Sequence, residues 1–169
     1  MPTTRDDLAA YLAELGIAAT TVEHVAVFTV EESQELRGTI PGAHSKNLFL
    51  KDKKDALFLV VAVEDTVIDL KGLHRHIGAA SRLSFGRPEL LMETLGVVPG
   101  SVTPFGLIND RPPRVNVVLD ARLVAAEIVN FHPLVNTATT SLPSAGLMTF
   151  IRATGHEPRV VDFAAIRPA

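Results

Sequence analysis

Two apolar segments separated by a short charged turn constrain the fold of this chain more than any other feature. The first reads K-N-L-F-L-K-D (46–52), and the second reads A-L-F-L-V-V-A-V-E (56–64). Their aliphatic, aromatic and β-branched residues favour strands, and the charged K-D-K-K-D between them suits a solvent-exposed tip. A connection this short cannot make the crossover that parallel strands need. The segments therefore predict an antiparallel hairpin.

The rest of the chain alternates between helical and extended patterns. A helix is expected over 5–15, with Thr4 as its N-cap and Gly16 as its stop, and Pro88 and Gly96 bracket a second helix. Further helices are predicted at 29–38, 65–78 and 143–155, and extended segments at 19–28, 82–85, 103–110, 114–120, 127–131, 137–142 and 158–163. Several neighbouring strands are joined by short loops. This order predicts an α+β fold in one domain (1–169), with a mixed, largely antiparallel, curved central sheet and flanking helices.

Composition excludes several classes of protein. The chain has 169 residues and no cysteine, so disulfides and thiolate chemistry are ruled out. No Cys/His or H-E-x-x-H pattern is present, and we expect neither metal nor cofactor. No apolar run approaches the ~20 residues that span a bilayer. The N-terminal segment also lacks the pattern of a signal peptide, so we expect a cytoplasmic protein with no membrane partner.

Charge is distributed unevenly along the chain. The formal net charge is −3, yet residues 46–87 carry eight basic and five acidic side chains. Such a region can face a phosphate chain or can simply be a solvated surface.

Three segments place polar residues beside apolar strands: 42–47, 97–110 and 130–140. Lys46 is either an ordinary charge at a strand end or a cation at the rim of a pocket, with Asn47 beside it. Gly100-Ser101 is either a plain turn or a loop whose backbone approaches a ligand. His132, held extended by Pro133, either binds a substrate or bonds a nearby carbonyl.

Together, G-A-H-S-K-N-L-F-L-K-D-K-K-D-A-L-F-L-V-V, P-G-S-V-T-P-F-G-L-I-N-D and N-F-H-P-L-V-N-T-A-T-T-S-L resemble the YbaK/prolyl-tRNA-synthetase-associated domain family. Over nearly the whole chain, the resemblance is greatest to its free-standing alanyl-tRNA(Pro) deacylases. It implies a metal-independent hydrolase that cleaves the ester of Ala-tRNA(Pro) in trans. A proline-sized pocket cannot fully exclude the smaller alanine, which is why a second, hydrolytic sieve is needed.

The resemblance also implies roles for residues. Lys46, Asn47, Gly100, Ser101 and His132 are the expected catalytic set. The expected substrate-binding positions are Val27, Phe28, Val30, Thr103, Pro104 and Asn136, and the expected tRNA-binding positions are Lys51, Lys53, Lys54 and Arg82. The segment F-H-P-L-V-N favours alanine over cysteine as the amino acid removed.

The expected partners are the acceptor end of mischarged tRNA(Pro) and, as a second candidate, prolyl-tRNA synthetase; no DNA partner is expected. Three alternatives remain open. One is a non-catalytic nucleic-acid-binding module that uses the central basic region. Another is a deacylase for cysteine or serine on tRNA. The third is an accessory subunit that docks onto a synthetase.

Overall fold

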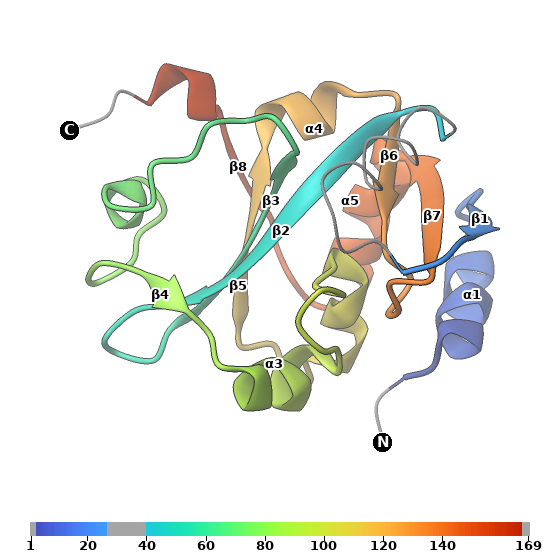
Figure 1. The fold of residues 1–169 in the computed structure, drawn as a ribbon, viewed down its shortest axis with the longest axis horizontal. Helices are drawn as coiled ribbons and strands as arrows, with labels where there is room; N and C mark the ends of the chain where they lie inside the picture. Colours follow the sequence, from blue (N-terminus) through green and yellow to red (C-terminus); the bar gives the residue numbers. More distant parts are fainter. Residues whose placement is uncertain (1–2, 27–39, 167–169) are drawn as a thin grey trace.

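The structure is a computed structural model that describes residues 3–26 and 40–166. Its strands form a mixed sheet in the order β1-β7-β6-β2-β3-β5-β8, with β4 also paired to β2 (Figure 1). The strands are β1 (Thr20–Glu23), β2 (Ala43–Lys51), β3 (Leu57–Val63), β4 (Ser84–Phe85), β5 (Val115–Asp120), β6 (Ile128–Phe131), β7 (Ala138–Pro143) and β8 (Arg159–Val161). The helices are α1 (Arg5–Glu14), α3 (Pro88–Leu95), α4 (Ala121–Ala125) and α5 (Ser144–Ala153), with 3-10 turns η1 (Leu73–Arg75), η2 (Pro104–Asn109) and η3 (Phe163–Ala165).

The predicted hairpin is confirmed as β2 and β3, which pair antiparallel from Ser45–Val63 to Lys51–Leu57. The sheet is mixed because β3–β5, β5–β8 and β2–β6 are parallel, whereas β1–β7, β6–β7, β2–β3 and β2–β4 are antiparallel. The β2–β6 ladder has only two pairs, Ala43–Val129 and His44–Asn130. The long strand β2 therefore joins two parts of the sheet that diverge beyond this short contact.

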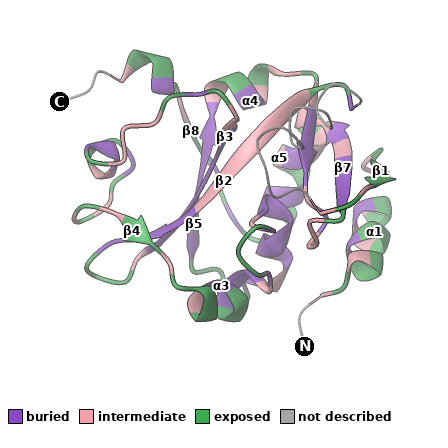
Figure 2. Cartoon of the chain, in the orientation of Figure 1, coloured by how far each residue is buried: buried purple, intermediate pink, exposed green. Residues whose placement is uncertain are grey.

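Both faces of the β3 region are buried, which explains its continuous apolar run (Figure 2). On one face Leu59 packs in a large cluster with Phe105 and Phe150, beneath α1, α3 and α5. On the other face Val60 packs in a smaller cluster that includes Leu73 and Phe163. Successive residues of a strand alternate between faces, so β3 supplies both clusters.

Several helix ends lie where capping residues, proline and glycine in the sequence predicted them. Thr4 and Asp7 form a capping box at the start of α1. Pro88 begins α3, and Gly96 ends it in the left-handed conformation that glycine adopts without steric cost. The expected helix from Pro143 is also present, as α5.

Two expected elements are wrong. The helix expected at 65–78 is reduced to η1, because the Asp69 carboxylate accepts a hydrogen bond from the Lys71 backbone (3.1 Å) and turns the chain instead. The strand expected at 103–110 is the 3-10 turn η2, capped by the Thr103 hydroxyl and begun by Pro104. The helices α4 and η3 were not predicted, and the helix expected at 29–38 lies outside the described residues.

Candidate functional site

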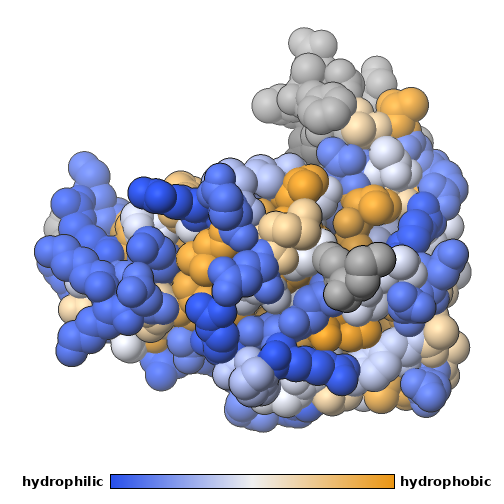
Figure 3. All heavy atoms as spheres, turned by 90° about the horizontal axis from the view of Figure 1, so that it is seen from below, coloured by the Kyte–Doolittle hydropathy of each residue, from blue (hydrophilic) through white to orange (hydrophobic). Residues whose placement is uncertain are grey.

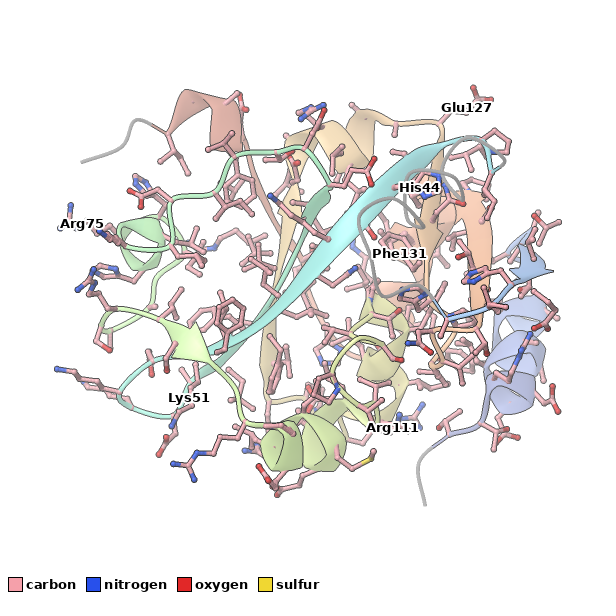
Figure 4. The ribbon with its side chains drawn as sticks, in the orientation of Figure 1. His44, Lys51, Arg75, Arg111, Glu127 and Phe131 are labelled. Carbon is pink, nitrogen blue, oxygen red and sulfur yellow. The ribbon has the colours of Figure 1, made fainter. Side chains whose placement is uncertain are left out.

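The candidate site lies where β2 and β6 diverge. His44–Asn130 is the last pair of their ladder. Lys46 lies two residues beyond it on β2, and His132 lies two residues beyond it immediately after the end of the parallel strand β6. A strand rises about 3.3 Å per residue, so each Cα is about 7 Å along the chain from the last pair. Figure 4 marks this region with His44 on β2 and Phe131 on β6.

Lys46 and Asn47 face opposite sides of β2, because the pairing with β3 is regular through both residues. The half-buried Lys46 donates a hydrogen bond from Nζ to the backbone carbonyl of Thr66. Asn47 Nδ2 donates to Ser45 Oγ (3.2 Å), which donates to the Asn130 carbonyl (3.0 Å). Among the described residues, the buried Asn47 Oδ1 has no hydrogen-bond partner. It is therefore an acceptor available to a bound donor.

His132 is held beside the loop that joins β6 to β7. Its Nδ1 lies 3.2 Å from the carbonyl of Ala138, a bond that requires the proton on Nδ1. In the neutral ring Nε2 is then an acceptor. Burial lowers the pKa of His132. The hydrogen bond to Ala138 raises this pKa, and the nearby His24 lowers it, so that the net shift is downward. The imidazole is thus held in its neutral form near neutral pH.

The glycine loop lies against the same β6–β7 connection. Gly100 has a φ of +92°, and a Cβ at this position would lie 3.8 Å from Asn136 Nδ2. The Ser101 N–H donates to Val98 (3.0 Å) and so closes a turn, whereas the Gly100 N–H has no partner within the part of the chain that the structure describes. Of the two amides, only that of Gly100 is available to a ligand.

The other expected substrate-binding positions divide into two groups. Thr103 and Pro104 are buried, and the Thr103 hydroxyl accepts a hydrogen bond from the Phe105 N–H (3.2 Å), so both support the start of η2. Val27, Phe28 and Val30 lie outside the described residues.

A buried carboxylate that sequence reasoning missed lies behind Lys46. Asp120 Oδ2 accepts from the Val63 N–H (3.1 Å) and the Thr66 hydroxyl (2.5 Å). Its Oδ1 accepts from the Arg122 N–H (3.0 Å) and so caps α4. The available sequence signal was an aspartate that ends an apolar strand immediately before a helical segment.

An exposed ion pair adjoins this carboxylate. Arg122 Nη1 donates to Asp65 Oδ1 (2.8 Å) and to the Thr66 hydroxyl (3.0 Å). The Arg122 hydrogen bond lowers the pKa of Asp65 and the pair raises that of Arg122. The positive charge of Lys46 also lowers the pKa of Asp65, less than Arg122 does.

The expected tRNA-binding residues gather at the other end of β2. The buried carboxylate of Asp52 accepts from the N–H groups of Lys54 (2.9 Å) and Ala80 (3.0 Å), and the Lys53 N–H donates to Ser81 Oγ (2.9 Å). These bonds fix the hairpin tip against the loop that carries Arg82. We call Lys51, Lys53, Lys54 and Arg82 the basic end; Figure 4 labels Lys51.

The basic end is separate from the Lys46 region. Lys51 lies five residues from Lys46 along β2, about 17 Å at the rise of a strand. Beside it, Phe85 of β4 is 60% exposed and pairs with Leu50. On the face seen from below, apolar side chains surface only in separate patches among polar ones (Figure 3).

The described residues hold neither a cluster of metal-ligating side chains nor a membrane-spanning helix. Within 3–26 and 40–166, no group of three or more histidine and acidic side chains could hold a metal ion. No helix in the same ranges is long and apolar enough to cross a membrane.

Comparison with known proteins identifies the family. Residues 24–150 match the model of the aminoacyl-tRNA editing domain. Among curated proteins, the chain is 41% identical over 163 residues to prolyl-tRNA synthetase associated domain-containing protein 1 of Xenopus laevis, covering 94% of this chain and 96% of that protein. It is 38% identical over 154 residues to the prolyl-tRNA editing protein ProX of Acetoanaerobium sticklandii, with 90% and 93% covered.

A more distant curated relative and a solved structure with the same fold are also similar to this chain. The multifunctional Ser/Thr-tRNA deacylase ProXp-y of Escherichia coli is 32% identical over 123 residues, 71% of each chain. A crystal structure described as that of a candidate trans-editing enzyme for prolyl-tRNA synthetase shares the fold, with a TM-score of 0.69, 22% identity, and 96% and 98% of the two chains covered.

The chain belongs to the aminoacyl-tRNA editing domain family, within its prolyl-tRNA-synthetase-associated group. The predicted family is thereby confirmed, and so is the predicted enzyme class, an aminoacyl-tRNA hydrolase.

Proposed function

We propose that this protein hydrolyses the ester of mischarged Ala-tRNA(Pro) in trans, without a metal. The observation that carries the proposal is the arrangement where β2 and β6 diverge. There, Lys46 and His132 follow the same two-pair ladder, and the unpartnered Asn47 acceptor lies on the opposite face of β2 from Lys46. Gly100 lies beside Asn136, which belongs to the loop that follows His132.

Each group has chemistry suited to an aminoacyl ester. The Lys46 ammonium has three N–H donors, of which Thr66 uses one, leaving two for the terminal phosphate or the ester carbonyl. The Gly100 N–H can donate to the same carbonyl as negative charge develops there. Because the ester is already activated, positioning and charge stabilisation suffice without a covalent nucleophile.

The acceptors would bind the amino group and the water. Asn47 Oδ1 can accept from the α-ammonium of alanine or from the attacking water. Neutral His132 can accept from water or a ribose hydroxyl through Nε2. A ribose hydroxyl of the tRNA assists attack in this scheme, because these residues do not include a strong general base.

The basic end would contact the acceptor stem of tRNA(Pro). Its lysines and Arg82 are exposed or half-buried around the hairpin tip, where cations can neutralise phosphates. We place the reaction in the cytoplasm, with prolyl-tRNA synthetase as the enzyme whose errors are removed. DNA, which lacks the aminoacyl ester, is not a substrate.

Serine is the second candidate amino acid. The relative named as a Ser/Thr-tRNA deacylase and the unpartnered Asn47 acceptor both favour it, because a serine hydroxyl could donate to Asn47 Oδ1.

A panel of charged tRNAs tests the substrate. Purified protein is mixed with tRNA(Pro) carrying alanine, serine, threonine, cysteine or proline, and ester loss is followed against buffer. We expect alanine to be released fastest and proline to be retained. Faster release of serine would support the second candidate, and release of none above buffer would overturn both.

A further inference from the structure

We propose that Asp120 and Thr66 are positioning residues for Lys46. The inference rests on the proposed function only for the catalytic role of Lys46. The position of the Lys46 ammonium rests on hydrogen bonds within the chain.

The Asp120 carboxylate fixes the segment that follows β3. The residue is fully buried at the end of β5, and both of its oxygens are used. One oxygen binds the Val63 N–H and the Thr66 hydroxyl, while the other caps α4. The turn that carries Thr66 is therefore tied at two points to the ends of β5 and α4.

Thr66 passes this constraint to Lys46. Its side chain is held by Asp120 and Arg122, and its backbone carbonyl accepts the hydrogen bond from Lys46 Nζ. A lysine stem has four rotatable carbons, so an ammonium at a strand edge otherwise samples many positions. One fixed acceptor limits this freedom and leaves the other N–H groups directed away from Thr66.

The arrangement offers a graded set of variants. Thr66→Val removes the hydroxyl but keeps the carbonyl and the size of the side chain, whereas Thr66→Ser keeps the hydroxyl. Asp120→Asn keeps the shape but turns one acceptor oxygen into a donor. Asp110→Asn is the matched control, because Asp110 is a buried carboxylate that precedes β5 and accepts from the Arg114 and Val115 N–H groups at its start (both 2.9 Å).

Deacylation kinetics provide the first measurement. We expect Asp120→Asn and Thr66→Val to lower kcat about 10- to 100-fold with little change in KM, since misplacement of a reacting group costs rates of that order. Thr66→Ser and Asp110→Asn should retain kcat. In a Lys46→Ala background, Asp120→Asn should have no further effect, because the two act through one group. Retained kcat in Asp120→Asn and Thr66→Val, or effects additive with Lys46→Ala, would overturn the proposal.

NMR of the lysine ammonium groups provides a measurement independent of activity. In protein labelled with 15N at lysine Nζ, the Lys46 signal is identified by its loss in Lys46→Ala. We expect a signal protected from solvent exchange in the wild type and in Thr66→Ser, and exchange broadening in Thr66→Val. If Asp120→Asn does not fold, the two Thr66 variants decide. A protected wild-type signal without deacylation would refute the proposed function alone, whereas an unprotected wild-type signal would refute the positioning role.

Discussion

At the scale of single residues, the candidate site depends on polar groups held in defined states beside apolar strands. His132 is neutral because its surroundings disfavour the imidazolium. Asn47 carries a buried acceptor without a partner among the described residues, a cost that the fold bears at this position. Both features suit a site that is completed when a substrate arrives.

The lowered pKa of His132 predicts the pH dependence of both activity and stability. We expect kcat to hold as pH falls below 6.5, the ordinary histidine value, and to decline only once the folded-state pKa is reached. The unfolded chain binds its proton first, so the stabilising contribution is complete above the unfolded pKa and is lost as pH falls from there to the folded pKa.

Urea unfolding and deacylation rates measured between pH 7.5 and 5 check this prediction. His132→Gln should lose less stability than the wild type over that interval. Equal losses in the two proteins would show that His132 titrates normally.

Asn47→Leu should separate stability from activity. A buried acceptor without a partner costs about 1–3 kcal/mol, and this exceeds the roughly 1 kcal/mol lost with the Asn47 Nδ2–Ser45 Oγ hydrogen bond, so the variant should be more stable by about 1 kcal/mol. Deacylation should fall, because the acceptor for substrate or water is lost. Thermal unfolding and rate measurements on the same preparation test both effects, and a variant with unchanged rate would remove Asn47 from the site.

At the scale of elements, β2 and β5 organise the molecule. β2 carries Lys46 in its first half and leads to the basic end, while β5 is held at both ends by a buried aspartate: Asp110 accepts from the N–H of its first residue, and Asp120 is its last residue. Asp110 ties the start of β5 to the end of α5 through His156, whose Nε2 lies 2.8 Å from Asp110 Oδ2. Burial alone would raise the pKa of Asp110, but the hydrogen bonds from His156 and two backbone N–H groups outweigh it and lower the pKa.

Asp110→Asn should therefore destabilise the fold by about 1–3 kcal/mol, because the hydrogen bonds that the Asp110 carboxylate accepts are weaker to a neutral amide oxygen. In the wild type the Asp110 contribution is present above the unfolded carboxyl pKa and disappears as pH falls through the lowered folded value. Chemical unfolding from pH 7 to pH 3 checks both statements. If Asp110→Asn lowered the free energy of unfolding by the same amount at pH 7 and at pH 3, both statements would be contradicted.

The elements that sequence predicted were those specified locally. The hairpin follows from its own apolar strands and charged tip, and α1 and α3 follow from caps within a few residues. The segments 65–78 and 103–110 were mistaken because single polar side chains, Asp69 and Thr103, bind nearby backbone and override the apolar pattern. The ladder between β2 and β6 could not be predicted, since two pairs between strands about 85 residues apart leave no local trace.

At the scale of the whole molecule, charge separates recognition from chemistry. The basic end lies about 17 Å along β2 from Lys46, far enough for one part to hold the acceptor stem while the other holds its aminoacylated terminus. The overall charge of −3 gives no general attraction to RNA, so binding should depend on this local cluster.

Lys53→Ala combined with Lys54→Ala should raise KM for charged tRNA several-fold while kcat stays near the wild-type value. The slope of log affinity against log salt should fall by about 0.7–0.9 for each phosphate contact removed. Arg111→Ala combined with Arg152→Ala is the matched control, because both arginines are exposed and lie outside the basic end. Equal effects of the two double variants would mean that the basic end has no special role.

The most direct test of the proposed chemistry compares wild type with Lys46→Ala under single turnover, using saturating protein and Ala-tRNA(Pro). Loss of one preorganised charge at the reacting ester should slow hydrolysis about 100-fold or more, while the melting temperature and tRNA affinity change little. A folded Lys46→Ala protein that still releases alanine at the wild-type rate would contradict the assignment of the ammonium to the reaction.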